Sequence, residues 1–332
     1  TQAQLTAATV LPLAITTDMT LAKGTLYRID GRTKVSNGAT ITVEPGTVIY
    51  GDSGEDILIF TKGTKLEAAG TVSEPIVFTS ATALLNPTSG DVGQWGGLTL
   101  LGNAPTNQID PRYEVDEADA DFAYGGTDAN DNSGTLKNIY ILNSGATFGA
   151  EQEVNGLSLA GVGSGTTVEN IYVENSSDDC IEIWGGTVNV TNATMVNCQD
   201  DSFDLDHGWT GTATNIVVQQ TVAGSHAGFE ISSGGNSPMT SGKIVNFVIN
   251  KVDGTDEGGI YVKDDTTAVQ YINGYVRTLS SDPAVLVRRA MLPAQQTTTK
   301  FADVILEATV NFGGEGAAQI ETIYTADDGS YE

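Results

Sequence analysis

Residues 174–211 bring together the side chains of this sequence that could do chemistry as a group. They include two aspartate pairs, 22 positions apart, and two further aspartates: Asp178, Asp179, Asp200, Asp201, Asp204 and Asp206. Lys and Arg are absent from residue 138 through residue 242. Carboxylate oxygens are the ligands that Ca²⁺ prefers, and the ion takes about six to eight of them. We therefore expect a structural calcium site here, and the alternative is a solvated acidic surface.

A second acidic candidate is the stretch from residue 110 to residue 134. It contains eight acidic residues and one Arg. Its segment "DANDNSG" offers alternating oxygen ligands from Asp128, Asn130 and Asn132. The Gly and the distal Glu of an EF-hand loop are missing from their usual positions, so the calcium motif is incomplete.

The two cysteines of the chain, Cys180 and Cys198, flank part of the same region. They enclose a short loop and could form a disulfide in an oxidising compartment. The alternative is a pair of buried thiols. The spacing therefore leaves both states open.

An internal repeat runs through the middle of the chain. Six segments start with Asn followed by an apolar residue, any residue and an apolar residue, at steps of 32, 22, 23, 31 and 27: Asn138, Asn170, Asn192, Asn215, Asn246 and Asn273. In phase with it runs a series of a small, an apolar, a polar and an apolar residue: "GLSL" at 156, "CIEI" at 180, "SFDL" at 202, "GFEI" at 228 and "GIYV" at 259. Such short alternating strands cannot bury themselves alone, but stacked on their neighbours they form a continuous core.

Stacking in register has consequences for both polar series. Strands of adjacent coils lie about 4.8 Å apart, so the Asn residues form a ladder in which each amide can donate to one coil and accept from the other. The aspartate pairs become vertical neighbours, and two carboxylates at that distance repel by roughly 3.5 kcal/mol at an effective dielectric constant of about 20. Because Lys and Arg are absent from these coils, we expect proton sharing, water or a metal to relieve the repulsion.

The repeat predicts an all-β fold, a right-handed single-stranded parallel β-helix with irregular caps or arms at both ends. We expect an N-terminal cap or arm at residues 1–34, the β-helix at 35–281 and a C-terminal cap or arm at 282–332. The last segment has lost the period, and an uncovered apolar end of a repeat stack would be sticky.

The runs "KLEAAGTVSEPIVFTS", "WGGLTLLGNAP", "YGGTDANDNSG", "NGLSLAGVGSGTTVEN" and "DDSFDLDHGW" resemble exported bacterial β-helix proteins of the pectin-lyase-like superfamily. The resemblance spans roughly residues 35 to 265. It implies the β-helix fold, and the members of this subgroup are mostly without an assigned activity.

A narrower resemblance concerns chemistry. "DDCIEI", "DHG" at 206–208 and "GGIYVK" are similar to motifs of polygalacturonase-type glycoside hydrolases. The resemblance implies that Asp178 and Asp179 do acid and base work, that His207 tunes them and that Lys263 holds an acidic sugar. This sequence departs from the family at Tyr261, which replaces its Arg, and at Asp206, which replaces a Gly.

The charge of the chain restricts its partners. Forty-two acidic and fifteen basic residues give a net charge of -27, which repels nucleic acid and anionic lipid. No run of the sequence is apolar enough for a transmembrane segment. Because the sequence begins at Thr1 without a Met or a signal segment, we expect a mature exported chain that is extracellular or at the cell surface.

We therefore expect a non-enzymatic structural protein, a self-assembling or adhesive β-helix subunit of a filament or surface layer stabilised by calcium. Its partners would be further copies of the chain, bound end to end or laterally, with carbohydrate as a further candidate. The alternative function is a polygalacturonase-like hydrolase or a polysaccharide lyase that acts on acidic glycans.

Overall fold

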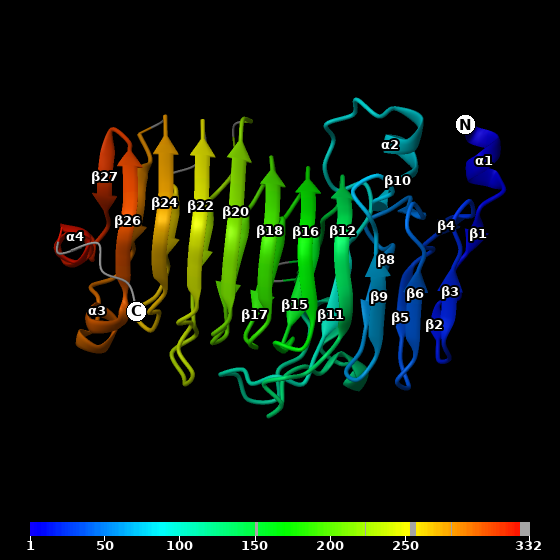
Figure 1. Ribbon diagram of the computed structural model, residues 1–332, viewed down its shortest axis with the longest axis horizontal. Coiled ribbons are helices and arrows are strands. Elements are labelled where there is room, and N and C mark those ends of the chain that lie inside the picture. Colours follow the sequence, from blue (N-terminus) through cyan, green and yellow to red (C-terminus); the bar gives the residue numbers. More distant parts are fainter. Residues whose placement is uncertain (150–151, 223, 253–256, 280, 326–332) are drawn as a thin grey trace.

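Parallel strands wind through the chain as successive coils of a right-handed β-helix, with the N-terminal coils at one end and the C-terminal coils at the other (Figure 1). The computed structural model describes residues 1–149, 152–222, 224–252, 257–279 and 281–325. Two long parallel sheets form the walls. The predicted all-β solenoid is confirmed.

The first sheet, sheet A, has 14 strands. They are β1 (Thr9–Val10), β3 (Met19–Leu21), β4 (Leu26–Arg28), β6 (Thr40–Val43), β7 (Val48–Gly51), β9 (Lys65–Ala69), β10 (Ile76–Ser80), β12 (Gly134–Leu142), β16 (Thr167–Glu174), β18 (Asn189–Val196), β20 (Thr212–Gln220), β22 (Lys243–Lys251), β24 (Gln270–Thr278) and β26 (Lys300–Glu307). From β12 onward each coil contributes one long strand, whereas the earlier coils contribute two short ones.

The second sheet, sheet B, has 11 strands. They are β2 (Ala14–Ile15), β5 (Arg32–Val35), β8 (Ile57–Phe60), β11 (Leu98–Leu101), β15 (Leu157–Ala160), β17 (Ile181–Trp184), β19 (Phe203–Asp206), β21 (Phe229–Ile231), β23 (Ile260–Val262), β25 (Pro283–Val287) and β27 (Val310–Gly313). A separate antiparallel hairpin joins β13 (Ala146–Gly149) and β14 (Gln152–Val154). The helices are α1 (Gln2–Thr6), α2 (Ala81–Leu85), α3 (Pro293–Thr298), α4 (Ala317–Thr325) and the 3₁₀ turns η1 (Glu114–Asp116) and η2 (Ala120–Phe122).

The Asn series lies at a bend in the long strands of sheet A. Asn192 donates to Oδ1 of Asn170 at 2.8 Å and accepts from Asn215 at 2.7 Å. The same side-chain bond links every consecutive pair from Asn138 to Asn273. All six residues have a φ between 50° and 59°. Asn tolerates this left-handed conformation better than most residues, and its amide bonds to the next coil, so the side chain serves both the bend and the stacking.

The β-helix extends past both boundaries that the sequence predicts. Parallel pairing begins at Thr9 and continues to Gly313, so residues 9–34 and 282–313 also belong to the coils. The register opposes Ile272 to Ala302 and therefore places Asp303 at the ladder position, with a φ of 51°. Because this position holds Asp instead of Asn, the Asn repeat in the sequence does not identify this coil. The N-terminal coils lack the Asn bend because two short strands replace the long one.

The C-terminal end of the core is covered by α4. Ile320 is fully buried in the main core, and the ring of Tyr324 packs at 6.0 Å from that of Phe301 and at 5.4 Å from that of Phe312. The expected cap is thus a helix added after the last coil. Residues 326–332 lie outside the described residues.

A covering loop, residues 102–133, lies over the outer face of sheet B. Its side chains Tyr113, Val115 and Phe122 form a second apolar cluster with Ile57 and Trp184, separate from the core inside the coils. Lys34 on β5, one of the N-terminal strands of sheet B, donates from Nζ to Asp119 at 2.9 Å and to Asp121 at 2.7 Å in the loop. The loop is therefore fixed as one wall beside the sheet.

Candidate active site

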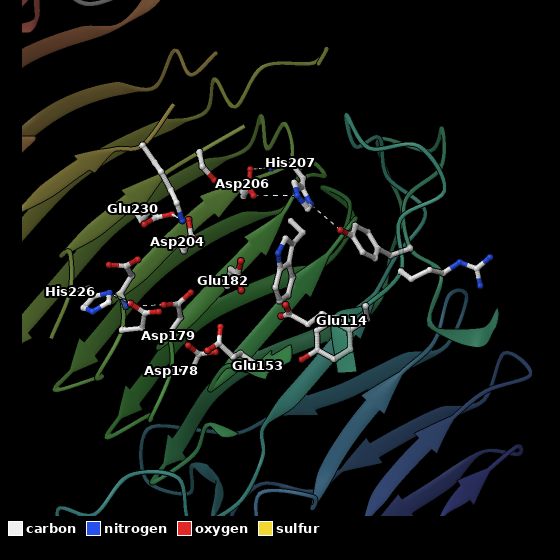
Figure 2. Close-up of a pocket in the computed structure, with 18 of the residues that line it drawn as sticks. Glu114, Glu153, Asp178, Asp179, Glu182, Asp204, Asp206, His207, His226 and Glu230 are labelled. Carbon is white, nitrogen blue, oxygen red and sulfur yellow. Dashed lines mark hydrogen bonds and ion pairs between the residues drawn. The ribbon is translucent and has the colours of Figure 1, made fainter. Parts of the chain in front are cut away.

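A cleft of about 530 Å³ lies between the covering loop and the outer face of sheet B (Figure 2). Twelve of its twenty lining residues are acidic: Glu114, Glu117, Glu153, Asp178, Asp179, Glu182, Asp200, Asp201, Asp204, Asp206, Glu230 and Glu257. The others include Trp184, Tyr113, His207, His226, Arg112 and Lys263. The volume falls in the range of about 300–1,000 Å³ that is usual for small-molecule sites.

Three carboxylates of the cleft project from neighbouring strands of sheet B. Glu182 on β17 is directly opposite Asp204 on β19, and Asp204 is directly opposite Glu230 on β21. Alternation along the strand explains their direction, because Ile181 and Ile183 on either side of Glu182 point into the core. The polar position of the second sequence series is therefore the position that faces the cleft.

A second column of oxygen atoms lies in the turns that precede these strands. Oδ1 of Asn155 accepts the backbone N–H of Asp179 at 3.1 Å, and Oδ1 of Asp179 accepts that of Asp201 at 2.8 Å. Asp201 in turn accepts the backbone N–H of Ala227. Each side chain thus satisfies a backbone donor of the next coil, so Asp179 and Asp201 have a structural role.

Burial and crowding raise the pKa of several carboxyls in the cleft. Burial, followed by the charges of Glu153 and Asp200, raises the pKa of Asp178 to about 8. Burial and the neighbouring Asp204 raise the pKa of Glu182 well above its ordinary value. The pKa of Asp204 rises for the same reason, with Glu230 as its main charged neighbour. Neighbouring carboxyls that cannot all ionise must share protons or bind a cation.

Basic side chains also relieve the repulsion, which corrects the expectation from the sequence. Nζ of Lys263 lies 2.6 Å from Oε1 of Glu230, one coil away, and His226 pairs with Asp200 and Glu257. The hydrogen bond to Asp200 raises the pKa of His226. Burial lowers the pKa of Lys263, but Glu230 outweighs burial and raises it overall. Stacking brings in a lysine from beyond residue 242, which inspection of the acidic coils alone could not reveal.

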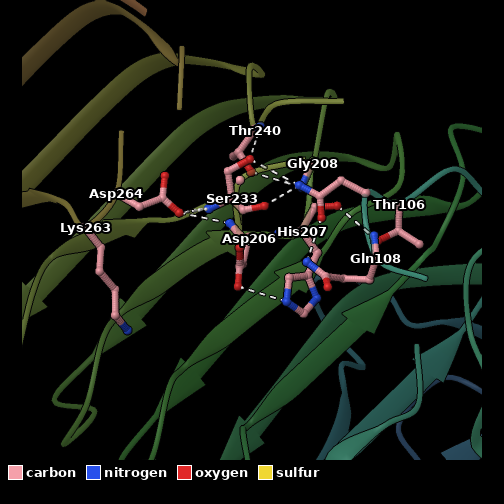
Figure 3. A network of polar contacts seen from close by, with 12 residues as sticks. Thr106, Gln108, Asp206, His207, Gly208, Ser233, Thr240, Lys263 and Asp264 are labelled. Carbon is pink, nitrogen blue, oxygen red and sulfur yellow. Dashed lines mark hydrogen bonds and ion pairs between the residues drawn. The ribbon is translucent and has the colours of Figure 1, made fainter. Parts of the chain in front are cut away.

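His207 joins the covering loop to the coil wall. Its Nδ1 lies 2.9 Å from the hydroxyl of Tyr124, and its Nε2 lies 3.3 Å from Oδ2 of Asp206 (Figure 2). Its carbonyl accepts the hydroxyl of Thr106 and the backbone N–H of Asn107, and the surrounding polar network continues through Ser233 (Figure 3). Burial lowers the pKa of His207, although Asp206 opposes the shift. A neutral imidazole that accepts from Tyr124 and donates to Asp206 fits this geometry.

Three groups of acidic residues in the cleft have oxygen atoms close enough to hold a metal ion. They are Asp178, Asp179 and Asp200; Asp179, Glu182 and Asp204; and Asp201, Glu230 and Glu257. Within each group the atoms lie within 4.8 Å of one another. Oxygen-only donors are suited to a hard cation such as Ca²⁺ or Mg²⁺.

Comparison with known proteins identifies the family to which this β-helix belongs. The sequence profile described as "Pectate-lyase like beta helix domain" matches residues 13–328. The chain belongs to this pectate-lyase-like β-helix family. No curated protein matches the sequence significantly.

One solved structure, titled "Crystal structure of Agl-KA catalytic domain", is similar to this pectate-lyase-like β-helix with a TM-score of 0.42 and 12% sequence identity. The match covers 90% of this chain and 61% of that one, so the chain spans less than two thirds of that protein. A similarity this low supports no statement about function.

The cleft of this pectate-lyase-like β-helix contains the acidic residues that the sequence singled out in the middle coils. Asp178, Asp179, His207 and Lys263, the residues implied by the hydrolase resemblance, all line it. Asp128, Asn130 and Asn132 lie outside it. Oδ1 of Asp128 accepts the backbone N–H of Asn130, and Oδ1 of Asn132 accepts that of Gly134. Their oxygens thus stabilise local turns.

Cys180 and Cys198 form a disulfide that is fully buried in the main core inside the coils. The sequence did not single out Glu153, Glu182, Glu230 or Glu257 as site residues. Glu182 and Glu230 stand at the polar position of "CIEI" and "GFEI", so the series contained a signal for them. Glu153 and Glu257 come from segments without a repeat, and only the fold brings them to the cleft.

Proposed function

We propose that this pectate-lyase-like β-helix is a glycoside hydrolase whose reacting pair is Glu182 and Asp204. The observation that supports this proposal best is the placement of the two carboxyls, side by side on neighbouring strands at the floor of an open cleft. Asp204 is 8% exposed, and its carboxyl hydrogen-bonds with that of Glu182. Hydrolysis of a glycosidic bond needs two carboxyl groups of this kind, one protonated and one ionised.

The surroundings of Glu182 and Asp204 would favour a state in which one carboxyl is protonated and the other is ionised. Two adjacent buried carboxyls share one proton more readily than both ionise. The protonated member would donate its proton to the glycosidic oxygen as the C–O bond breaks. The ionised member would stabilise the positive charge that develops on the sugar, or attack it. A water molecule would then supply the hydroxyl group to the sugar and restore the proton.

The other contacts would hold the pair in place. Oε2 of Glu182 accepts the side-chain amide of Asn155 at 2.6 Å, and Asn155 is fully buried. Trp184 lies two residues further along β17 on the same face, with its ring at 5.6 Å from that of Tyr113. An aromatic edge beside a carboxyl pair is a common surface for a sugar ring.

The acidic glycans that the sequence suggested fit this cleft poorly. Arg112 and Lys263 are the two Arg or Lys residues that line it, and each has an acidic partner, Asp110 and Glu230. A uronate would meet twelve acidic side chains. A lyase that abstracts a proton next to a uronate would also need an available base of the Arg or Lys type. We therefore expect a glycan without carboxylates.

The test is release of reducing ends from a panel of polysaccharides, with mass spectrometry of the products. Hydrolysis adds the mass of one water per cleaved bond, whereas a lyase leaves an unsaturated sugar without adding water. We expect hydrolytic products from at least one uncharged or basic glycan. Unsaturated products would assign the cleft to a lyase, and an inert enzyme across the panel would remove the catalytic proposal.

Calcium remains a second candidate for the cleft, because the three groups of closely spaced carboxylates fit a hard cation. Asp179, Glu182 and Asp204 would hold it, and its charge would offset the repulsion among them. Thermal unfolding with EDTA and with added calcium tests this. A midpoint that calcium raises supports a structural ion, and an unchanged midpoint removes it.

Self-assembly is favoured by one feature of the opposite face. A register column on the outside of sheet A contains exposed apolar side chains at Tyr140, Val217, Val248 and Ile305, of which Ile305 is 63% exposed. A lateral contact between copies would bury such a column. Sedimentation of the wild type and of an Ile305→Lys variant would show concentration-dependent association that the variant weakens, if this surface assembles.

Export is supported by the disulfide, since such bonds persist mainly in oxidising compartments. No helix of the described residues is both long and apolar enough to cross a bilayer. We therefore place the working site of the protein outside the cytoplasm, where polysaccharides are available. Detection of the chain in the medium or on intact cells would test this.

A further inference from the structure

The cleft holds far more carboxylates than hydrolysis requires. Two suffice for the chemistry, and twelve acidic residues line the cavity. Crowding them costs free energy in the free protein, because neighbouring carboxylates repel and burial removes their water. A ligand that brings positive charge would relieve this cost on binding, whereas an uncharged sugar would leave it in place.

The surplus carboxylates surround the reacting pair on several sides (Figure 2). Glu230 extends the column of Glu182 and Asp204 along sheet B. Asp178 and Asp200 belong to the turns that precede the strands, and Glu114 comes from the covering loop. A chain of sugars lying in the cleft would therefore meet carboxylates beside more than one ring.

The strand carboxyls face one another at the centre of this array. Oδ1 of Asp204 is buried and accepts no N–H group of the described residues, and the carboxyl of Asp204 hydrogen-bonds with that of Glu182. Its neighbours across the strands are the carboxyls of Glu182 and Glu230, which offer the same kind of atom. Lys263 is already bound to Glu230 at 2.6 Å. A donor from a ligand would satisfy this oxygen.

An ammonium group meets these requirements. It carries one positive charge and three N–H donors, and carboxylates bind it with short, charge-assisted hydrogen bonds. A glycan with a free amine on each ring presents such groups at regular intervals along the chain. A uronate presents the opposite charge, and an N-acetylated or unmodified sugar presents none.

We infer, on the basis of the hydrolytic function proposed above, that the cleft selects glycans with free amino groups, such as polymers of glucosamine. The carboxylates outside the reacting pair are then the specificity determinants. Glu230 and Glu257 also pair with Lys263 and His226, and their remaining acceptor positions bind the amines beside the scissile bond. Glu182 and Asp204 act on the bond itself. The bulk charge of -27 would also concentrate a cationic polymer around the protein.

The experiment compares three hexamers with the same β-1,4 backbone that differ only at carbon 2: glucosamine, N-acetylglucosamine and glucose. Binding to the whole chain is measured by isothermal titration calorimetry at neutral pH, where the amine is partly protonated and more of the cleft carboxyls are ionised than in acid, and at low and high salt. We expect the glucosamine hexamer to bind at least about tenfold more tightly than the other two, and the preference to shrink at high salt. A glucosamine hexamer that binds no better, or not at all, overturns the inference.

Single substitutions test which carboxylates bind the amino groups. Glu257→Gln should weaken binding of the glucosamine hexamer by several-fold, and Glu67→Gln, on sheet A, is the matched control. Equal binding by Glu257→Gln and the control would also overturn the inference. Calcium is tested as the competing cation. If it binds in the cleft and the amine shows no preference over glucose, the carboxylates serve the metal and the inference fails.

Cleavage assays on the same hexamers separate this inference from the proposed function. Tight binding of the glucosamine hexamer without hydrolysis would contradict the proposed hydrolase function and would support the proposed selection of amino groups. If the glucose hexamer is hydrolysed as fast as the glucosamine hexamer, the hydrolase function is supported and the selectivity for amino groups is contradicted.

Discussion

Asp179 accepts the backbone N–H of Asp201 at 2.8 Å, from a position exactly one coil earlier in the β-helix. The same relationship links Asn155 to Asp179 and Asp201 to Ala227. Part of the acidic cluster is therefore a set of caps for buried backbone donors. Among the described residues, the strand carboxyls of Glu182 and Asp204 cap no backbone N–H of the next coil, and they hydrogen-bond with each other instead.

This relationship predicts different effects of two substitutions at Asp179. Asp179→Ala removes the acceptor and leaves a buried N–H unpaired, which should lower the free energy of unfolding by about 1–3 kcal/mol. Asp179→Asn keeps an oxygen at Oδ1 and removes a buried charge, so its stability should equal or exceed that of the wild type. Urea unfolding measures both. Equal losses in the two variants would contradict the capping role.

The crowded carboxyls predict that stability falls as the pH rises. The pKa of Asp178 is raised from 3.8 to about 8. Between these values the folded chain holds a proton that the unfolded chain has lost. The free energy of unfolding therefore decreases with pH across this window. His226 acts in the same direction, because its raised pKa contributes stability that is lost as it deprotonates.

Unfolding midpoints between about pH 5 and about pH 8 test this dependence, since both conditions lie within the window. The wild type should melt several degrees lower at the higher pH. Asp178→Asn cannot ionise and should show a flatter profile. A wild-type profile that rises with pH would show that the carboxyls are ionised and well solvated in the folded protein.

The bond between Tyr124 and His207 predicts that one hydroxyl stabilises the covering loop. Tyr124→Phe removes the partner of Nδ1 and should cost about 1 kcal/mol. Amide hydrogen exchange in the covering loop should become faster, and the pKa of His207 should rise toward its ordinary value as solvent enters. Tyr172→Phe, which loses a hydroxyl bond to Glu174 on sheet A, is the control. Unchanged amide hydrogen exchange in the covering loop would contradict a stabilising role for the bond between Tyr124 and His207.

The Asn ladder predicts a measurable difference between two replacements of Asn192. Asn192→Ala loses both ladder bonds and puts a residue that tolerates the left-handed region less well than Asn at a φ of 57°, so it should cost about 2–4 kcal/mol. Asn192→Gly loses the same bonds but adopts this backbone without strain. It should therefore be the more stable of the two by chemical denaturation, although Gly is usually the worse residue in a strand. An Ala variant as stable as the Gly variant would contradict the role of the bend.

The sequence predicts the fold well because stacking makes it periodic. The apolar alternation and the Asn residues recur at every coil from Asn138 to Asn273, and the coils lie in the register that this spacing implies. The ends are harder to predict, because Asp303 replaces the Asn and the first coils divide the long strand. Parallel backbone pairing between coils continues through both changes, so the fold tolerates them.

The cleft is only partly visible in the sequence. The spacing of Asp179 and Asp201 predicts their vertical contact, and the polar position of the second series indicates Glu182. The covering loop has no repeat, and its docking depends on contacts such as that of Lys34 with Asp119, which join residues far apart in the chain. Lys263 likewise reaches Glu230 only after the coils have stacked.

The comparison of wild type with Glu182→Gln on a cleaved glycan tests the central claim most directly. Gln retains an oxygen for the bond from Asn155, so the fold should persist, and Glu67→Gln on sheet A serves as the control. We predict that kcat falls by about 10²–10⁴ while KM changes little, because in the proposed function Glu182 either donates the proton or stabilises the charge that develops in the transition state. A Glu182→Gln enzyme with the kcat of the control would show that the strand carboxyls of the cleft do not perform the reaction.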